Sequence, residues 1–184
     1  RGDLVQGRED LLAALGLRTA VVDRGTLPSV FATIRQLGAA AGVADRGNTL
    51  VGGFGNDNLI TNALGGTVGP GDLVFGNEGN DSINLFPGAD TAFGGLGNDS
   101  VIDNGAGNAL FFGNEGNDTV IATTATATTV VGGQDSADGN DNILTGAGAD
   151  IVFGNGGNDT INVAAGTNTV VGGFGNDGIT AAND

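Results

Sequence analysis

Residues 161–177 read INVAAGTNTVVGGFGND, and residues 83–99 (INLFPGADTAFGGLGND) and 143–159 (ILTGAGADIVFGNGGND) follow the same plan. Each stretch ends in a Gly-Asn-Asp tripeptide behind a glycine-rich segment. The tripeptide occurs seven times, and the spacings between its aspartates are 24, 18, 19, 23, 18 and 18 residues. A period near 18 that carries one carboxylate predicts a solenoid, in which the coils stack these acids into a column.

Each period holds two turn-like segments and two strand-like segments. One turn reads G-[GN]-x-G-N-D, the other reads G-x-[ND], and aliphatic residues follow the first turn in every copy. Gly, Asn and Asp suit tight turns and positive backbone angles, whereas aliphatic residues suit short strands. We therefore predict an all-β fold, a right-handed parallel β-roll or β-helix of about seven coils, with the coils about 4.8 Å apart.

The chain divides into two segments of different composition. Residues 1–45 are expected to form a mostly helical N-terminal cap, because residues 9–15 are good helix formers and Pro28 suits the first turn of a second helix. Repeat arrays generally need such a cap over their first coil. Residues 46–184 are expected to form the roll.

Two insertions lengthen the period, between Leu59 and Asp81 and between Gly132 and Asp141. Both fall in turn-like sequence. We therefore expect the extra residues, such as 134–138 (QDSAD), to loop outward without disturbing the strand register.

Charge and composition exclude several classes of function. All six basic residues lie in the first 46 positions, whereas residues 47–184 carry 16 acids and no base. Such an acidic segment excludes nucleic acid as a partner, and the longest small-apolar run, residues 37–44, is too short for membrane insertion. The chain has no Cys, His, Lys or Tyr, so we expect neither a disulfide framework nor an enzyme.

The repeats resemble the glycine-rich nonapeptide G-G-x-G-x-D-x-U-x of the RTX (repeats-in-toxin) calcium-binding family, in which U is a large aliphatic residue. Residues 52–59 (GGFGNDNL), 94–101 (GGLGNDSV) and 172–179 (GGFGNDGI) match it fully, and three further copies have asparagine in the second position. The resemblance spans about three quarters of the chain. It implies a calcium-binding β-roll with Ca²⁺ as its cofactor.

Seven stacked aspartates leave six gaps, and we expect up to six calcium ions there, because Ca²⁺ takes oxygen ligands from carboxylates and backbone carbonyls. Without calcium this acidic segment is expected to be disordered or molten. The expected side-chain ligands are Asp57, Asp81, Asp99, Asp118, Asp141, Asp159 and Asp177. Backbone carbonyls are expected from Gly53, Gly55, Asn77, Gly79, Gly95, Gly97, Asn114, Gly116, Asn155, Gly157, Gly173 and Gly175. On the opposite edge, Asp72 and Asp90 are the only acids in adjacent coils and form a possible second-edge site.

Two adjacent apolar columns run along one strand of each period, and they cannot both enter the core because side chains alternate along a strand. One column should face inward and the other outward as a ladder, which either the N-terminal helix or a second copy of the protein would cover. The inward columns are expected at Leu59, Ile83, Val101, Val120, Ile143, Ile161 and Ile179 and at Leu50, Val74, Ala92, Phe111, Val130, Val152 and Val170. The adjacent column is Val51, Phe75, Phe93, Phe112, Val131, Phe153 and Val171.

The leading interpretation is an extracellular bacterial structural protein, a calcium-stabilised roll that self-assembles into a surface layer, filament or adhesin. Assembly would use the ladder or the ends of the solenoid, which makes a homo-oligomer or filament the expected partner state. The RTX resemblance implies type I secretion and folding outside the cell. Two alternatives remain: a calcium-dependent ice-binding protein, although the outward threonine row is missing, or the calcium-binding tail of a secreted enzyme.

Overall fold

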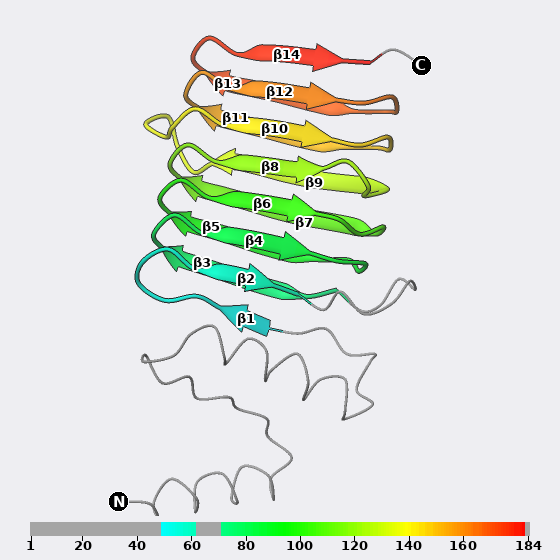
Figure 1. The fold of residues 1–184 in the computed structure, drawn as a ribbon. Helices are drawn as coiled ribbons and strands as arrows, with labels where there is room; N and C mark the ends of the chain where they lie inside the picture. Colours follow the sequence, from blue (N-terminus) through cyan, green and yellow to red (C-terminus); the bar gives the residue numbers. More distant parts are fainter. Residues whose placement is uncertain (1–48, 62–70, 183–184) are drawn as a thin grey trace, which may run out of the picture. The chain divides into compact units, whose positions relative to one another are not determined.

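The structure, a computed structural model, describes residues 49–61 and 71–182 (Figure 1). These residues form two parallel sheets of seven strands each and contain no helix. The first sheet consists of β1 (Thr49–Val51), β3 (Leu73–Glu78), β5 (Thr91–Leu96), β7 (Asn108–Glu115), β9 (Ala127–Gly133), β11 (Ile151–Gly156) and β13 (Thr169–Phe174). The second sheet consists of β2 (Asn58–Ile60), β4 (Ser82–Leu85), β6 (Ser100–Asp103), β8 (Thr119–Ala122), β10 (Asn142–Thr145), β12 (Thr160–Val163) and β14 (Gly178–Ala181).

Odd-numbered and even-numbered strands alternate along the chain, so the path winds between the two sheets and rises by one strand per turn (Figure 1). The predicted all-β parallel solenoid is thereby confirmed, with about six turns between β1 and β14. The predicted helical cap at residues 1–45 and its boundary lie outside the described residues. Among the described residues, no helix is long and apolar enough to span a membrane.

The parallel register keeps equivalent residues of successive coils in line. Val101 in β6, for example, pairs with Ile83 of the coil before it and with Val120 of the coil after it. Backbone hydrogen bonds therefore run along the solenoid axis, and each coil depends on its neighbours for them. The same register stacks any side chain that the repeat places at a fixed position.

The core is a thin layer between the sheets, built from the two predicted inward columns. Side chains in the middle coils are almost fully buried: Ile83 and Phe111 are 0 % exposed, and Val101 is 1 % exposed. Ile179, in the outermost strand β14, is 47 % exposed. A third inward column, two positions after the first, contributes Leu85, Ala122 and Val163 together with three polar residues, Thr61, Asp103 and Thr145.

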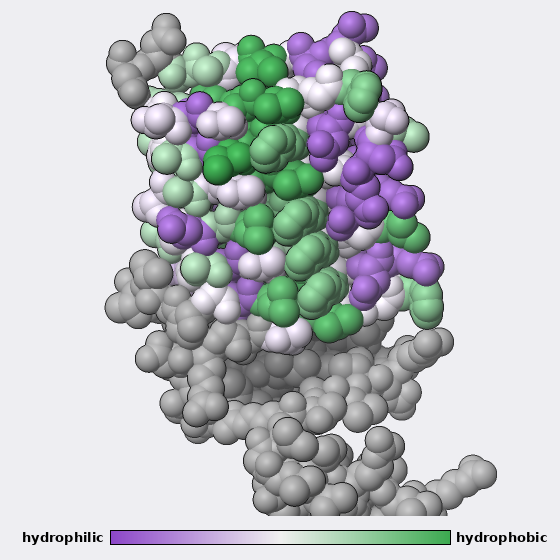
Figure 2. All heavy atoms as spheres, turned by 180° about the vertical axis from the view of Figure 1, so that it is seen from behind, coloured by the Kyte–Doolittle hydropathy of each residue, from purple (hydrophilic) through white to green (hydrophobic). Residues whose placement is uncertain are grey.

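Of the two adjacent apolar columns in the first sheet, one forms part of the core and the other faces outward, as side-chain alternation along a strand requires. Val74 is fully buried whereas Phe75, its neighbour, is only half-buried. The rings of Phe75, Phe93 and Phe112 stack face to face, with centroids 5.1 and 4.8 Å apart. Figure 2 shows this apolar ladder as a stripe along the outer face of the sheet, with hydrophilic side chains along one edge. The ladder consists of Val51, Phe75, Phe93, Phe112, Val131, Phe153 and Val171.

Candidate metal site along the aspartate column

The Gly-Asn-Asp turns form one edge of the roll, where each strand of the first sheet leads into the next strand of the second sheet. Their backbones adopt positive φ angles, between 74° at Asn155 and 133° at Gly116. Glycine tolerates this region freely, and asparagine tolerates it better than most residues. Of the 12 predicted carbonyl donors, all but Gly53 have positive φ: Gly55, Asn77, Gly79, Gly95, Gly97, Asn114, Gly116, Asn155, Gly157, Gly173 and Gly175.

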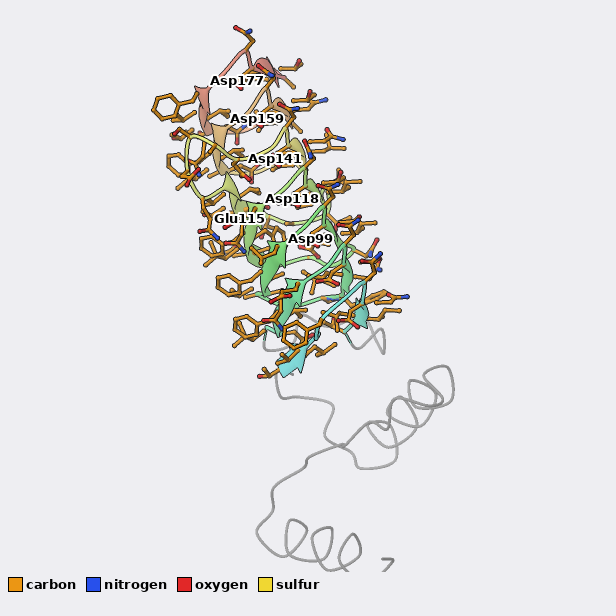
Figure 3. All side chains as sticks on the ribbon, turned by 90° about the vertical axis from the view of Figure 1, so that its left-hand side faces the viewer. Asp99, Glu115, Asp118, Asp141, Asp159 and Asp177 are labelled. Carbon is orange, nitrogen blue, oxygen red and sulfur yellow. The ribbon has the colours of Figure 1, made fainter. Side chains whose placement is uncertain are left out.

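The seven predicted aspartates stack in a single file at this edge, and Figure 3 labels five of them. The Oδ1 atom of each aspartate accepts a hydrogen bond from the backbone N–H of the aspartate one coil earlier. Asp81 N–H donates to Asp99 Oδ1 at 2.8 Å, for instance. Six such bonds, 2.7 to 3.0 Å long, link Asp57 to Asp177 without a break.

The second carboxylate oxygen, Oδ2, is buried without a hydrogen-bond partner in the five inner copies. These aspartates are only 1 to 3 % exposed, and a buried charge without a partner is strongly unfavourable. No basic residue follows Arg46, so no side chain of the roll itself offers a counter-charge. The five residues are Asp81, Asp99, Asp118, Asp141 and Asp159.

The first glycine of each repeat lies against this oxygen. A Cβ atom on Gly94 would overlap both Asp99 Oδ2 and the carbonyl oxygen of Gly113, and Gly76, Gly113 and Gly154 have the same surroundings in their own coils. Carboxylate and carbonyl oxygens of neighbouring coils thus face one small space. The predicted carbonyl donors, at the second and fourth positions, do not include these first glycines. The sequence does contain a signal for the importance of the first glycine: the first position is glycine in all seven copies, whereas the second is glycine or asparagine.

Burial raises the pKa values of the inner aspartates. It raises the pKa of Asp99 to about 6, of Asp118 to about 7 and of Asp141 to about 8, from an ordinary value of 3.8. The pKa values of Asp81 and Asp159 are raised for the same reason. Hydrogen bonds from the backbone lower these pKa values, and repulsion between neighbouring aspartates raises them further. The column therefore favours a bound positive charge, either protons or metal ions.

Comparison with known protein families identifies the repeat. A family model described as RTX calcium-binding nonapeptide repeat (4 copies) matches residues 44–63, 71–101, 103–123, 135–170 and 146–179, well over half of the chain. The chain belongs to the RTX calcium-binding repeat family. No curated protein and no solved structure was found to match the chain.

The donor set of the RTX column fits calcium. Among residues 49–61 and 71–182, no group of three acidic side chains could hold an ion by itself. Aspartates of neighbouring coils are stacked, as Asp81 and Asp99 are. Backbone carbonyls such as that of Gly113 are available beside them. Ca²⁺ takes 6–8 oxygens and readily combines carboxylates with carbonyls. The aspartates and turn carbonyls would hold it, and its charge would replace the protons that the buried Oδ2 atoms otherwise attract.

A second file of polar side chains lies beside the RTX column on the exposed side. The Oδ1 atom of each asparagine in Gly-Asn-Asp accepts a hydrogen bond from the backbone N–H of the next asparagine, at 2.5 to 2.8 Å. Amide ladders of this kind satisfy turn backbone groups without adding charge. The asparagines therefore hold the turns in register, whereas the aspartates carry the charge.

The opposite edge of the RTX roll is less regular. Asp72 and Asp90 are brought together as expected, since Asp72 N–H donates to Asp90 Oδ1 at 2.7 Å. The next two coils carry Ala109 and Thr128 at the equivalent position. Asp150 follows, and both of its oxygens are occupied: Oδ1 accepts from Thr128 N–H at 2.8 Å, and Oδ2 accepts from the Thr145 hydroxyl at 2.7 Å.

The insertion at residues 134–138 adds an acid to the first edge of the roll. Residues 134–137 are exposed, as expected of an outward loop. Asp138, however, turns back: its Oδ1 accepts from Gly116 N–H at 2.9 Å, and its Oδ2 is buried without a partner. Its charge also raises the pKa values of Asp118 and Asp141. The expectation that the whole insertion loops outward is therefore wrong for its last residue.

Proposed function

We propose that this chain is an extracellular structural protein of a bacterium, a calcium-stabilised RTX roll that self-assembles into a surface layer, filament or adhesin. The observation that carries the proposal is the apolar ladder, which runs along the outer face of one sheet next to a hydrophilic edge (Figure 2). A contiguous exposed apolar stripe is characteristic of an interaction surface. The role is structural rather than catalytic, because the roll offers carboxylates as its only acid–base side chains.

The ladder suits a second copy of the same chain. Its rungs repeat once per coil, as the ring spacings of 5.1 and 4.8 Å between Phe75, Phe93 and Phe112 illustrate. A surface that contacts every side chain of the ladder must have the same spacing, and a second roll has this spacing because its coils repeat at the same distance. The rolls are acidic along their whole length, so bound calcium would also reduce the repulsion between two copies.

Calcium would set where the roll folds. RTX repeats are calcium-binding, and extracellular calcium modules bind with dissociation constants on the order of 10⁻⁴–10⁻³ M. A chain of this affinity would stay unfolded in a calcium-poor cytoplasm and fold after type I secretion. Isothermal titration calorimetry tests this point, and a dissociation constant below the micromolar range would contradict it.

Electron microscopy of the purified chain at millimolar calcium and in EDTA tests assembly. We expect ordered filaments or layers in calcium and none in EDTA; soluble monomers under both conditions would refute self-assembly. A triple alanine variant at Phe75, Phe93 and Phe153 should bind calcium but fail to assemble. The matched control is a triple alanine variant at Ile60, Ile102 and Ile121, which are partly exposed on the other sheet and should leave assembly intact.

A further inference from the structure

Two buried carboxylates at the opposite edge of the roll have oxygens that no hydrogen bond satisfies. Asp90 is 1 % exposed and Asp103 is 2 % exposed. In each residue Oδ1 accepts a backbone hydrogen bond, from Asp72 N–H at 2.7 Å and from Gly105 N–H at 2.8 Å. In each residue Oδ2 is buried and has no partner. Neither free oxygen belongs to the aspartate column.

The strand register places these two side chains in neighbouring coils, at the same edge of the roll. Asp90 ends the turn that begins at Leu85, and Asp103 pairs in register with Leu85 one coil further along. On the first edge, residues in the same relationship meet at Gly76, where a Cβ atom would overlap both Asp81 Oδ2 and the Gly94 carbonyl oxygen. Burial raises the pKa of Asp90 to about 6, with a smaller contribution from the charges of Asp72 and Asp103.

At the equivalent positions three coils further along, the second carboxylate oxygen is satisfied by a hydrogen bond from an uncharged side chain. There Thr145 stands where Leu85 stands in the coil of Asp90, and its hydroxyl donates to Asp150 Oδ2 at 2.7 Å. Leu85 has no such donor. The coil after Asp90 has Ala109 in place of an acid, while Asp103 stands where the nonapeptide has its first glycine. In this coil the acid, Asp103, thus lies at the position of the first glycine and not at the usual position of the aspartate.

We propose that Asp90 Oδ2 and Asp103 Oδ2 hold one divalent cation, calcium by its preference for carboxylate oxygens, at the second edge of the roll. The proposal rests on the proposed calcium binding of the chain, but its ligand pair lies outside the repeated motif. Two buried carboxylates in neighbouring coils, with no basic side chain after Arg46, need a positive charge close to their unpartnered oxygens. Backbone carbonyls and water would complete the coordination.

Native mass spectrometry in calcium counts the ions that each chain retains. Asp103→Asn and Asp90→Asn should each retain one ion fewer than the unmodified chain, and the double variant should also lose one ion only, because both residues serve a single site. Asp150→Asn is the matched control, since Asp150 is buried at the same edge with both oxygens already occupied. It should retain the full number of ions.

Asparagine can accept the existing backbone hydrogen bonds, so these variants should fold, and circular dichroism in calcium checks that they do. If Asp103→Asn retains as many ions as the unmodified chain, the two acids share a proton instead and the proposal is refuted. If the unmodified chain retains no calcium at all, the proposed calcium binding fails as well. Anomalous scattering from crystals of the unmodified chain soaked in terbium gives a second test, in which a peak between Asp90 and Asp103 is expected and its absence counts against the site.

Discussion

The two oxygens of each of the five inner aspartates of the column have different roles. Oδ1 accepts a hydrogen bond from the backbone N–H of the preceding aspartate, as between Asp81 and Asp99, and this bond links the turns of neighbouring coils. Oδ2 has no such partner and faces the carbonyl oxygens of the first glycines. The same side chain therefore provides a structural hydrogen bond and a second oxygen that is available to a metal ion.

The first glycine of each repeat is predicted to be needed both for stability and for calcium binding. In Gly94→Ala, the new methyl group would overlap Asp99 Oδ2 and the Gly113 carbonyl, so the carboxylate must move. Overpacking of this kind costs about 1–3 kcal/mol, and displacing Asp99 should also remove a calcium ligand. Urea denaturation and calcium titration of the variant should show both losses.

Gly178→Ala is the control for this substitution. A Cβ atom there would meet only the Asp159 carbonyl oxygen at 3.8 Å, an ordinary contact. The Gly178→Ala substitution replaces the same residue type without displacing a carboxylate. Stability and calcium affinity should therefore stay close to those of the unmodified chain. Equal effects of the two substitutions would mean that glycine at the first position serves the backbone and not the ion.

The calcium-free roll is predicted to be more stable in mild acid than at neutral pH. Folding raises the pKa values of Asp99, Asp118 and Asp141 to about 6, 7 and 8 from 3.8, so the folded state holds protons that the unfolded chain has released. The resulting contribution to stability is complete below about pH 4 and is lost as pH rises through about 6 to 8. In EDTA, the β-rich circular dichroism signal of the roll should therefore be stronger at about pH 5 than at about pH 8, where the calcium-free chain is expected to be disordered.

Calcium should reverse this pH dependence, because the ion binds the deprotonated carboxylates and competes with protons. The Asp141→Asn variant, which cannot titrate at this position, should lose part of the dependence in EDTA. A β-rich signal in EDTA that is equal or stronger at the more alkaline pH would contradict the burial of these carboxylates.

At the residue scale, sequence reasoning predicts the column but not the surroundings of each acid. The repeated motif places Asp57 to Asp177 in one file, because equivalent residues of successive coils stack. Positive φ at Gly95 and Gly97 could be predicted from residue type. The contact between Gly94 and Asp99 could not, because it depends on where the carboxylate turns after the coil has closed.

At the scale of the strand, the same contact explains which apolar column faces outward. Both Val74 and Phe75 are apolar, so composition alone does not choose between them. Gly76 must face inward, because it lies against Asp81 Oδ2. Alternation along β3 then places Phe75 outward and Val74 inward, as observed. The orientation of the ladder therefore follows from the position of the aspartate.

The inserted loop shows the limit of reasoning from loop length. Extra residues can leave a coil without disturbing it, and residues 134–137 do so. The backbone hydrogen bonds between coils nevertheless require an acceptor for Gly116 N–H. One coil earlier, the Glu115 carbonyl accepts the equivalent bond from Gly97 N–H at 2.8 Å. Asp138 Oδ1 takes over this role, and only the three-dimensional path of the insertion reveals it.

Two substitutions at Asp138 should separate its hydrogen bond from its charge. Asp138→Asn keeps an acceptor for Gly116 N–H and loses the charge, whereas Asp138→Ala loses both. An unsatisfied buried donor costs about 1–3 kcal/mol, so the alanine variant should unfold at lower urea concentration than the asparagine variant. Ser136→Ala, at an exposed position of the same loop, should have no effect. Equal stability of the two Asp138 variants would show that the hydrogen bond contributes little.

At the scale of the whole roll, the distribution of charge decides how folding is controlled. Residues 47–184 carry 16 acids and no base, and the column concentrates seven of them at one edge. Neighbouring carboxylates lie one coil apart, about 4.8 Å, which is shorter than the Debye length of about 8 Å at physiological ionic strength. The inner aspartates are also buried, so dissolved salt cannot screen them effectively.

Bound calcium, rather than ionic strength, is therefore predicted to fold the roll. Circular dichroism should change from a disordered to a β-rich spectrum at millimolar calcium, and remain disordered in sodium chloride of matched ionic strength. Magnesium at the same concentration should also fail, because it demands a near-octahedral shell at about 2.0–2.1 Å and gives up its water reluctantly, whereas the gaps offer carboxylates and carbonyls of successive coils. If sodium or magnesium folded the chain as well as calcium does, repulsion along the column would be relieved by general screening, and the buried Oδ2 atoms would not be calcium ligands.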